Sequence, residues 1–294
     1  MKISIIMIDG GFRENAYGID FFCKQDFPED EYEVIWVDYY NKAHPNAVNN
    51  PRIKVVTLGR NGTYHSSYCF NKGINESKGE VIVIPDADQI VNSNFLTRVW
   101  NIHTLYHKLV VYGYRYDQKE EKKLHSLNLI ELRKKCVLKN PLNYGGCLTV
   151  RKKWLEKING YEQHPIFATG NHANGLDLYT RFKNFGLSVQ WEPTLKLYHP
   201  WHFSTLMPAK ELIAQKKLIE WRKQNIQWLS FMGMNSDKNV KMPPAVQLLL
   251  EKELINLRED SFSRLIRLIT KIVTSAAIEC FMEIKRFHAK RTRG

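Results

Sequence analysis

The sequence lacks any run of roughly 18 nearly uncharged apolar residues, the length that a membrane-spanning helix requires. Its first apolar stretch, residues 3–8, is too short for a signal peptide, and Asp9-Gly10-Gly11 interrupts it where a cleavage region would begin. We therefore expect a cytoplasmic protein that is either soluble or peripheral at the inner face of the membrane.

Cysteine is sparse and unpatterned as well. The chain holds five cysteines, an odd number without Cys-x-x-Cys spacing, and this favours reduced thiols with a structural role. The sequence also has no internal period of the kind that builds a solenoid. At 294 residues, 44% of them hydrophobic, the chain is long enough to bury a sizeable core.

Acidic residues are outnumbered by basic ones, 30 against 43, which gives a net charge of +13. Residues 206–294 hold 17 of the basic and 9 of the acidic residues, so an anionic partner surface is expected there. Residues 262–287 predict an amphipathic helix with basic flanks, typical of an anionic membrane interface. The alternative is a helix packed on the rest of the chain or in a dimer interface, so an oligomer stays open.

A nucleic-acid partner is not expected. The basic residues fall in predicted helices with broad apolar faces, whereas single-stranded nucleic acid is typically bound on a sheet that carries aromatic side chains.

Strand and helix patterns alternate over the first 90 residues. Apolar runs predict strands at residues 3–8, 33–37, 53–58 and 81–84, with helix-like stretches at 15–24 and 66–75 between them. This alternation predicts βαβ units and an α/β fold. Further strands are expected at 109–114, 145–150, 188–191 and 195–199, and further helices at 94–107, 151–158 and 176–185.

Two segments depart from this alternation. Residues 117–140 are rich in lysine and predict a solvated helix or a mobile loop. From about residue 209 the pattern is helical throughout. We expect a first domain of residues 1–205 and a basic helical extension of residues 206–294 that contacts a membrane, an acceptor or another subunit.

The most informative stretch is the β-branched run of residues 81–84, which is followed by Pro85-Asp86-Ala87-Asp88. Ligands of open α/β sheets bind at the carboxyl ends of strands, and a hard divalent cation that bridges phosphates needs a carboxylate there. A metal-dependent nucleotide site is the leading interpretation. The alternative is an ordinary turn, because Asp is common where strands end.

Several motifs follow one another in a defined order. After Asp38 come Asn71-Lys72-Gly73, Asp86-Ala87-Asp88 and Gly145-Gly146, and then Asp177-Leu178-Tyr179-Thr180-Arg181 and Tyr198-His199. In this order the chain resembles the family 2 glycosyltransferases over residues 1–205. The resemblance implies the GT-A fold, which is a Rossmann-like, mixed and mostly parallel sheet flanked by helices. It also implies Mn²⁺ or Mg²⁺ and a nucleotide-sugar donor, with UDP as the favoured nucleotide.

The resemblance implies a role for individual positions. Asp38 matches the residue that contacts the base, although Tyr39 stands where the family usually has a second Asp. Asp88, Asp86 and His199 match the metal site, and His202 lies near enough in sequence to substitute. The expected donor-binding residues are Asp9, Asp38, Tyr39, Asn71, Asp86, Ala87, Asp88, Gly145 and Gly146. The acceptor-side candidates are Trp191, Trp201 and His202.

One departure concerns the catalytic base. Inverting members usually carry a Glu-Asp pair where this chain has Asn174-Gly175. Asp177 and His172 are the candidates to replace it. Asp177 has a second interpretation as an ion-pair partner of Arg181, four residues later.

The preferred hypothesis is therefore a metal-dependent transferase, inverting by preference with retention left open. It moves a sugar from a nucleotide-sugar to a glycan or lipid-linked glycan. The alternative is a nucleotide-sugar-binding or glycan-binding homologue without turnover.

Overall fold

The computed structural model describes residues 1–11, 14–122, 124, 127–168, 172–202 and 209–254. The chain divides into two compact units, Met1–Pro243 and Pro244–Gly294. In the second unit the described residues, 244–254, are helical. The helix expected at residues 262–287 lies outside the described residues.

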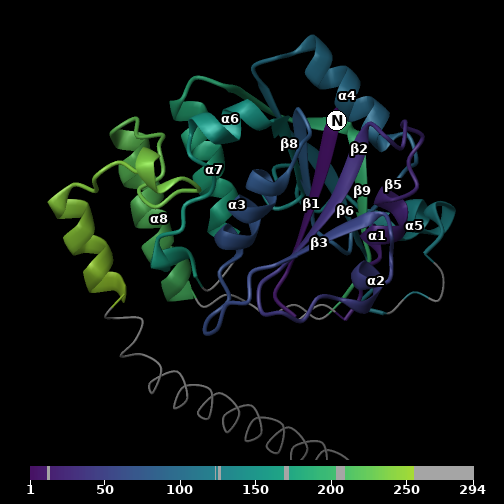
Figure 1. Ribbon diagram of the computed structural model, residues 1–294, viewed down its shortest axis with the longest axis horizontal. Coiled ribbons are helices and arrows are strands. Elements are labelled where there is room, and N and C mark those ends of the chain that lie inside the picture. The colour runs from purple at the N-terminus through teal and green to yellow at the C-terminus, as the bar shows by residue number, and fades with distance from the viewer. Residues whose placement is uncertain (12–13, 123, 125–126, 169–171, 203–208, 255–294) are drawn as a thin grey trace, which may run out of the picture. The chain divides into compact units, whose positions relative to one another are not determined.

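A nine-stranded sheet forms the centre of the first unit, as far as the described residues show (Figure 1). Eight of its strands lie in the order β3-β2-β1-β4-β8-β6-β9-β5, and β7 pairs with β6. The strands are β1 (Ile3–Asp9), β2 (Tyr32–Asp38), β3 (Ile53–Thr57), β4 (Val81–Pro85), β5 (Ile90–Val91), β6 (Leu109–Gln118), β7 (Cys136–Val137), β8 (Cys147–Arg151) and β9 (Ser188–His199).

Helices cover both faces of this sheet (Figure 1). Alternate residues of β1 belong to different cores: Ile3, Ile5 and Met7 pack on one face, and Ile6 and Ile8 on the other. The first face is covered by α1 (Gly18–Phe22), α2 (Pro45–Val48) and α4 (Phe95–Leu105). The second is covered by α3 (Ser66–Glu76), α6 (Lys152–Lys157) and α7 (His172–Asn184). Burial on both faces explains why these strands read as continuous apolar runs.

The α/β fold is confirmed, and the sheet is mixed. The ladders β1–β2, β1–β4, β2–β3 and β6–β9 are parallel. The ladders β4–β8, β6–β8, β6–β7 and β5–β9 are antiparallel. The mixed sheet that the resemblance implies is therefore present, and its second half combines antiparallel ladders with the long parallel ladder β6–β9. The strand order reverses at β1, between β2 and β4, which is where ligands of open α/β sheets bind.

One long strand replaces two expected ones. Residues 188–191 and 195–199 both belong to β9, and its pairing with β6 shifts between Gly113 and Tyr114. A Cβ atom at Gly113 would lie 2.4 Å from Leu197 Cδ1 and 3.0 Å from the Leu195 carbonyl oxygen. The absence of a side chain at Gly113 therefore gives β9 room to continue past the irregularity.

The segment expected to be a solvated helix or mobile loop is partly ordered into the sheet. Strand β6 continues to Gln118, and residues 129–135 form a short helix, α5 (Leu129–Lys135), that leads into β7. The Asn128 side chain caps this helix by accepting a hydrogen bond from the Glu131 backbone N–H at 2.8 Å. Leu132 anchors it in a small core with Ile90 and Tyr198.

Residues 209–243 belong to the first compact unit, whereas the sequence pattern places a boundary at residue 205. The described part of this segment, including α8 (Ala209–Gln224), belongs to the same compact unit as the sheet. Buried residues of α8 include Ala214, Leu218 and Arg222. No helix in the described part of the chain is long and apolar enough to cross a membrane.

Candidate functional site

Carboxylates lie at the ends of the central strands. Asp9 and Asp38 are the last residues of β1 and β2 and stand side by side in the register of that pair. Strand β4, the other neighbour of β1, leads directly into Asp86 and Asp88. Because these three strands are parallel, all four acids gather at one edge of the sheet.

Asp88, His199 and His202 form a cluster that could hold a metal ion. Their ligand atoms all lie within 4.8 Å of one another. Asp88 approaches His199 Nε2 at 3.7 Å and His202 Nε2 at 3.3 Å. The antiparallel pairing of β5 with β9 causes this meeting, since Ile90 is opposite Tyr198 and thereby brings the β4–β5 turn beside the end of β9.

A second carboxylate orients His199. Asp117 of β6 lies opposite His199 in the parallel β6–β9 ladder, and its Oδ1 lies 3.0 Å from His199 Nδ1. Burial favours the neutral acid, but the hydrogen bond with His199 and the charge of Arg115 outweigh it and lower the pKa of Asp117. An ionised Asp117 accepts a hydrogen bond from His199 Nδ1–H and leaves His199 Nε2 facing Asp88, the arrangement common in metal sites.

We expect Asp117 to strengthen metal binding through His199, and this can be tested. The Asp117→Asn variant is expected to weaken Mn²⁺ binding about 10–100-fold, because an amide no longer fixes the tautomer of His199. Calorimetric titration of the folded variant with Mn²⁺ measures this change. An unchanged affinity would show that His199 needs no orienting partner.

Asp86 lies outside the three-residue cluster. Its Oδ2 accepts a hydrogen bond from Gln89 Nε2 at 3.1 Å and lies 3.7 Å from Arg115 Nη1. The Gln89 amide also donates to the Gly146 carbonyl at 2.7 Å. This bond ties the β4–β5 turn to the entry of β8. Metal ligation by Asp86 stays a prediction.

The surroundings of Asp38 suit a polar ligand. The side chain is fully buried, and its Oδ2 accepts a hydrogen bond from the Lys42 backbone N–H at 2.6 Å. Its Oδ1 has no hydrogen-bond partner among the described residues. A buried acceptor oxygen left without a donor is costly unless a ligand or water supplies one. Asp38 is thus the candidate acceptor for a nucleoside group.

Tyr39 belongs to an aromatic cluster beside Asp38. Its ring makes edge contacts with Tyr40 and Tyr64, with centroids 4.7 and 5.3 Å apart, and its hydroxyl donates to the Thr63 carbonyl at 3.0 Å. Burial raises the pKa of Tyr39. The side chain that replaces the family's second Asp therefore fills space at this strand end.

Two predicted binding residues have structural contacts. The Asn71 amide donates to the Tyr161 carbonyl at 2.8 Å and accepts from the Tyr161 N–H at 2.7 Å, so that α3 holds the turn after α6. At Gly146, a Cβ atom would lie 3.1 Å from the Gly113 carbonyl oxygen. Both residues fix the frame around the site, and any contact of theirs with a ligand stays a prediction.

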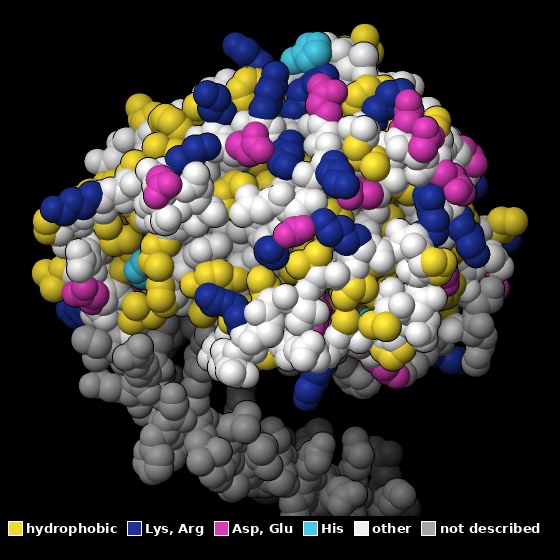
Figure 2. Space-filling view, viewed as in Figure 1, with side chains coloured by type: hydrophobic (Ala, Val, Ile, Leu, Met, Phe, Trp, Pro, Cys, Tyr) yellow, Lys and Arg dark blue, Asp and Glu magenta, His cyan; other side chains and the backbone are white. Residues whose placement is uncertain are grey.

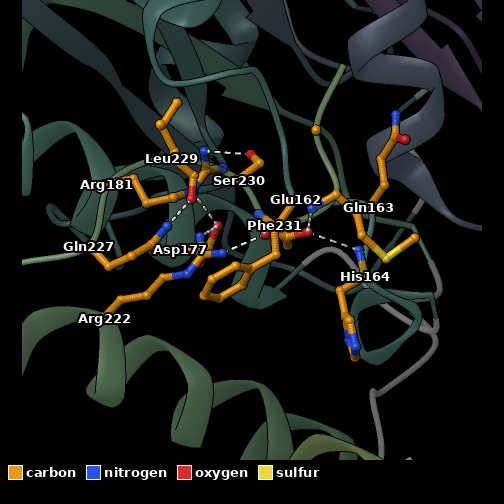
Figure 3. A network of polar contacts seen from close by, with 12 residues as sticks. Glu162, Gln163, His164, Asp177, Arg181, Arg222, Gln227, Leu229, Ser230 and Phe231 are labelled. Atoms are coloured by element: carbon orange, nitrogen blue, oxygen red, sulfur yellow. Dashed lines mark hydrogen bonds and ion pairs between the residues drawn. The ribbon is translucent and has the colours of Figure 1, made fainter. Parts of the chain in front are cut away.

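Asp177 lies in a buried ion network (Figure 3). Its carboxylate accepts hydrogen bonds from Arg181 Nε at 2.8 Å and from Arg222 Nη1 at 2.9 and 3.1 Å. Arg222, from α8, also pairs with Glu162. The Glu162 carboxylate accepts the backbone N–H groups of Phe231 and Met232, each at 2.8 Å.

This network favours one of the two interpretations of Asp177. The ion pair with Arg181 is present, and the side chain is 2% exposed. A general base must come within hydrogen-bond reach of its substrate proton, whereas both Asp177 oxygens already bind guanidinium groups. These contacts favour a structural role for Asp177, and its role as the base stays a prediction. For His172, the other candidate, the backbone lies in α7 and its side chain lies outside the described residues.

Asn174 and Gly175, which stand where inverting members carry their Glu-Asp pair, are both tightly packed. The Asn174 amide donates to the Ser66 hydroxyl at 2.8 Å and is buried. A Cβ atom at Gly175 would lie 2.5 Å from the Tyr144 carbonyl oxygen. Because this oxygen belongs to the backbone, relief of the clash would require the main chain to shift. The loop before β8 therefore occupies the space that a side chain at residue 175 would need.

Gly175 is accordingly expected to be a packing requirement. The Gly175→Ala variant should unfold at lower urea concentration, with a loss of about 1–3 kcal/mol, because the added methyl overpacks the contact with Tyr144. Gly186→Ala tests a different cost, since a Cβ there meets nothing within 4 Å but the residue has a φ of +85°. Equal stability of Gly175→Ala and the wild type would contradict the close contact.

The acceptor-side aromatic residues are partly structural. Trp191 stacks on Tyr112, with ring centroids 5.3 Å apart, and its Nε1 donates to the Asn143 carbonyl at 3.1 Å. The Trp201 backbone N–H donates to Gln118 Oε1 at 3.0 Å. Contact of either indole with an acceptor stays a prediction.

Three residues of this region carry no sequence motif. Asp117 lies in a lysine-rich stretch, and Arg222 lies in a helix assigned to an extension. Gln89 follows the paired carboxylates without any recognisable spacing. Only the strand register and the packing of α8 reveal what these side chains contact.

On the face in Figure 2, Lys and Arg lie interspersed with Asp and Glu among hydrophobic side chains, and no block of one sign stands out. This distribution offers no support on that face for a nucleic-acid footprint.

Comparison with known proteins finds a family-model match over part of the chain and a likeness to solved structures. The model of glycosyl transferase family 2 matches residues 18–159. Among solved structures, the chain is similar to a crystal structure of S. aureus TarS 1-349, with 16% identity and a TM-score of 0.56 over 90% of this chain and 73% of that one. A TarS 1-349 structure in complex with UDP has 18% identity and a TM-score of 0.56, with the same coverage.

Two further matches concern the same S. aureus protein. The complex of TarS 1-349 with UDP-GlcNAc has 15% identity and a TM-score of 0.56 over 86% of this chain and 72% of that one. The match to a longer TarS structure has 16% identity and a TM-score of 0.55 and covers 77% of this chain but 41% of that one. No curated protein sequence matches the chain. At these identities the likeness shows the GT-A-type fold.

Proposed function

This chain carries a glycosyl transferase family 2 domain in residues 18–159, and on that premise we propose a metal-dependent transfer from a UDP-sugar to a glycan or lipid-linked glycan. The observation that carries the proposal is the convergence of Asp88, His199 and His202 beside the carboxyl ends of β1, β2 and β4. The UDP and UDP-GlcNAc complexes of the structurally similar TarS support the choice of donor.

The residues at the cluster fit a divalent cation. A carboxylate and an imidazole nitrogen are ligands that Mn²⁺ accepts, and Asp117 supplies the outer hydrogen bond that such sites usually have. Asp88 and His199 would hold the ion. When bound, it would stabilise the negative charge that develops on the departing nucleoside diphosphate.

The other residues position the donor. The buried Oδ1 of Asp38 would accept a hydrogen bond from an N–H or O–H group of the nucleoside. The hydrogen bond from the Lys42 backbone N–H to Oδ2 keeps the carboxylate in place. Gln89 fixes the β4–β5 turn through Asp86 and Gly146, so that Asp88 faces the two histidines from a rigid position. These contacts hold the binding geometry before the donor arrives.

A second function is favoured by a specific observation. Asn174 carries an amide that cannot take up a proton at neutral pH, and Gly175 has no room for a side chain. A homologue that binds a nucleotide-sugar without turnover would tolerate both changes. Inverting transfer is the preferred reaction and needs a base other than residues 174 and 175, with His172 and Asp177 as the candidates.

A membrane-bound acceptor is part of the proposal. The basic, amphipathic pattern of residues 262–287 suits an anionic surface, and a lipid-linked glycan would be presented there. Binding to vesicles with and without anionic lipid tests this element separately from the transfer reaction.

Calorimetric titration with UDP-, GDP- and dTDP-sugars, first with Mn²⁺ and then with excess chelator, tests the central proposal. Metal-dependent binding of one donor is the expected result. Binding accompanied by donor hydrolysis supports the transferase, whereas binding with no hydrolysis or transfer favours the binding homologue. Absence of binding to every donor would contradict both.

A further inference from the structure

The imidazoles of His199 and His202 lie unusually close together. Their Nε2 atoms are 3.1 Å apart, and the rings meet nearly edge to face at an interplanar angle of 80°. Two neighbouring ligands at right angles on one ion, with bonds of about 2.1 Å, would lie about 3.0 Å apart. The two nitrogens therefore already have the separation that a shared ion imposes.

The same nitrogen of His202 also faces the carboxylate. His202 Nε2 lies 3.3 Å from Asp88 Oδ2, while His199 Nε2 lies 3.7 Å from Asp88 Oδ1. The His199 side chain is 16% exposed and that of Asp88 8%, whereas His202 is 41% exposed. His202 thus closes the cluster from the solvent side.

We propose that His202 is a second imidazole ligand of this centre and that it makes the site prefer transition-metal dications over Mg²⁺. This inference deepens the proposed function at the same site and rests on it. Three protein ligands leave room in a six-coordinate shell for diphosphate oxygens and water.

The preference follows from ligand chemistry. Mg²⁺ binds oxygen ligands and water, whereas imidazole suits the later first-row metals, whose affinity for a given site rises from Mn²⁺ to Co²⁺. With His199 as the single imidazole, the site would remain acceptable to Mg²⁺. A second imidazole exchanges an oxygen or water position for nitrogen, which raises Co²⁺ and Mn²⁺ affinity more than Mg²⁺ affinity.

The test measures metal binding by the full chain without nucleotide. Calorimetry follows Mg²⁺, Mn²⁺ and Co²⁺, and visible absorption follows the ligand field of bound Co²⁺. The variants are His202→Ala, His202→Gln and Asp88→Ala, with the exposed His107→Ala as the matched control. Thermal unfolding checks that each variant is folded, which we expect for the half-exposed His202.

We expect the wild type to bind Co²⁺ and Mn²⁺ more tightly than Mg²⁺. In His202→Ala and His202→Gln, Co²⁺ affinity should fall by about 10–100-fold or more, and the absorption spectrum of bound Co²⁺ should change. Mutation of a residue that only hydrogen-bonds to a metal ligand already costs about 10–100-fold in affinity, so the loss of a ligand should cost at least as much. Mg²⁺ affinity should change little. Asp88→Ala should lose all three ions, and His107→Ala should match the wild type.

Two results would overturn the inference, and they have different meanings. If both His202 variants keep the Co²⁺ affinity and spectrum while Asp88→Ala loses them, His202 is only a hydrogen-bond neighbour and the metal-dependent transferase stands. If Asp88→Ala also binds every ion as the wild type does, the cluster is not the metal site. In that case the metal dependence of the proposed function fails with the inference.

Discussion

Asp88→Ala is expected to abolish metal-dependent binding of a UDP-sugar, with a loss of affinity of about 100-fold or more. Asp88 is the only carboxylate of the three-residue cluster found in the described part of the chain, and both histidines face it. Without this negative ligand, two neutral imidazoles must hold a dication by themselves, and the ion no longer bridges protein and diphosphate.

The measurement is a pair of calorimetric titrations with the UDP-sugar, with Mn²⁺ and with chelator. Asp88→Asn serves as a second variant, because it keeps the shape of a side chain that is 8% exposed. Asp30→Ala, at an exposed position, is the matched control. If Asp88→Ala and Asp88→Asn both bound the donor with unchanged Mn²⁺ dependence, the assignment of the metal centre would be wrong.

Arg222→Met is expected to lower the free energy of unfolding by about 3–5 kcal/mol, the cost of breaking a buried ion pair from one side. The Arg222 guanidinium is fully buried and binds the carboxylates of Asp177 and Glu162 (Figure 3). Its removal leaves the buried Glu162 carboxylate with only backbone N–H groups as hydrogen-bond partners among the described residues.

Urea unfolding of Arg222→Met measures this loss. Lys223→Ala is the matched control on the same helix, because Lys223 pairs with Glu220 at the surface and both side chains are at least half exposed. That variant should change stability by less than about 1 kcal/mol. A loss of similar size in the two variants would show that the buried network is not what attaches α8.

A double-mutant cycle separates charge from packing. The double variant with Glu162→Gln and Arg222→Met should be more stable than the sum of the two single losses predicts. Together the two substitutions remove both charges of the Arg222–Glu162 contact, so neither charge is left buried without its partner. Strict additivity would mean that Arg222 stabilises the fold through its packing against Phe231 instead.

Much of the fold follows from patterns within short stretches. Strands β1, β2 and β4 are mostly apolar because helices cover both faces of the sheet. Their sequences therefore predict a sheet of this class and place carboxylates at the ends of its strands. Asp38 and Asp88 are carboxylates that these patterns place at strand ends. The irregular half of the sheet is harder to predict from the sequence, because the continuity of β9 depends on Gly113, some 80 residues away in the chain.

The sequence by itself determined the family resemblance, the doubly covered sheet and the carboxylates at its strand ends, because these depend on local composition and on residues close together in the chain. Only the tertiary structure decided which groups meet. The register of the strands places Asp117 beside His199, and it places His202 beside Asp88. The packing of α8 adds Arg222 to Arg181 as a partner of Asp177. Such pairings arise from contacts between distant segments, and no spacing along the chain encodes them.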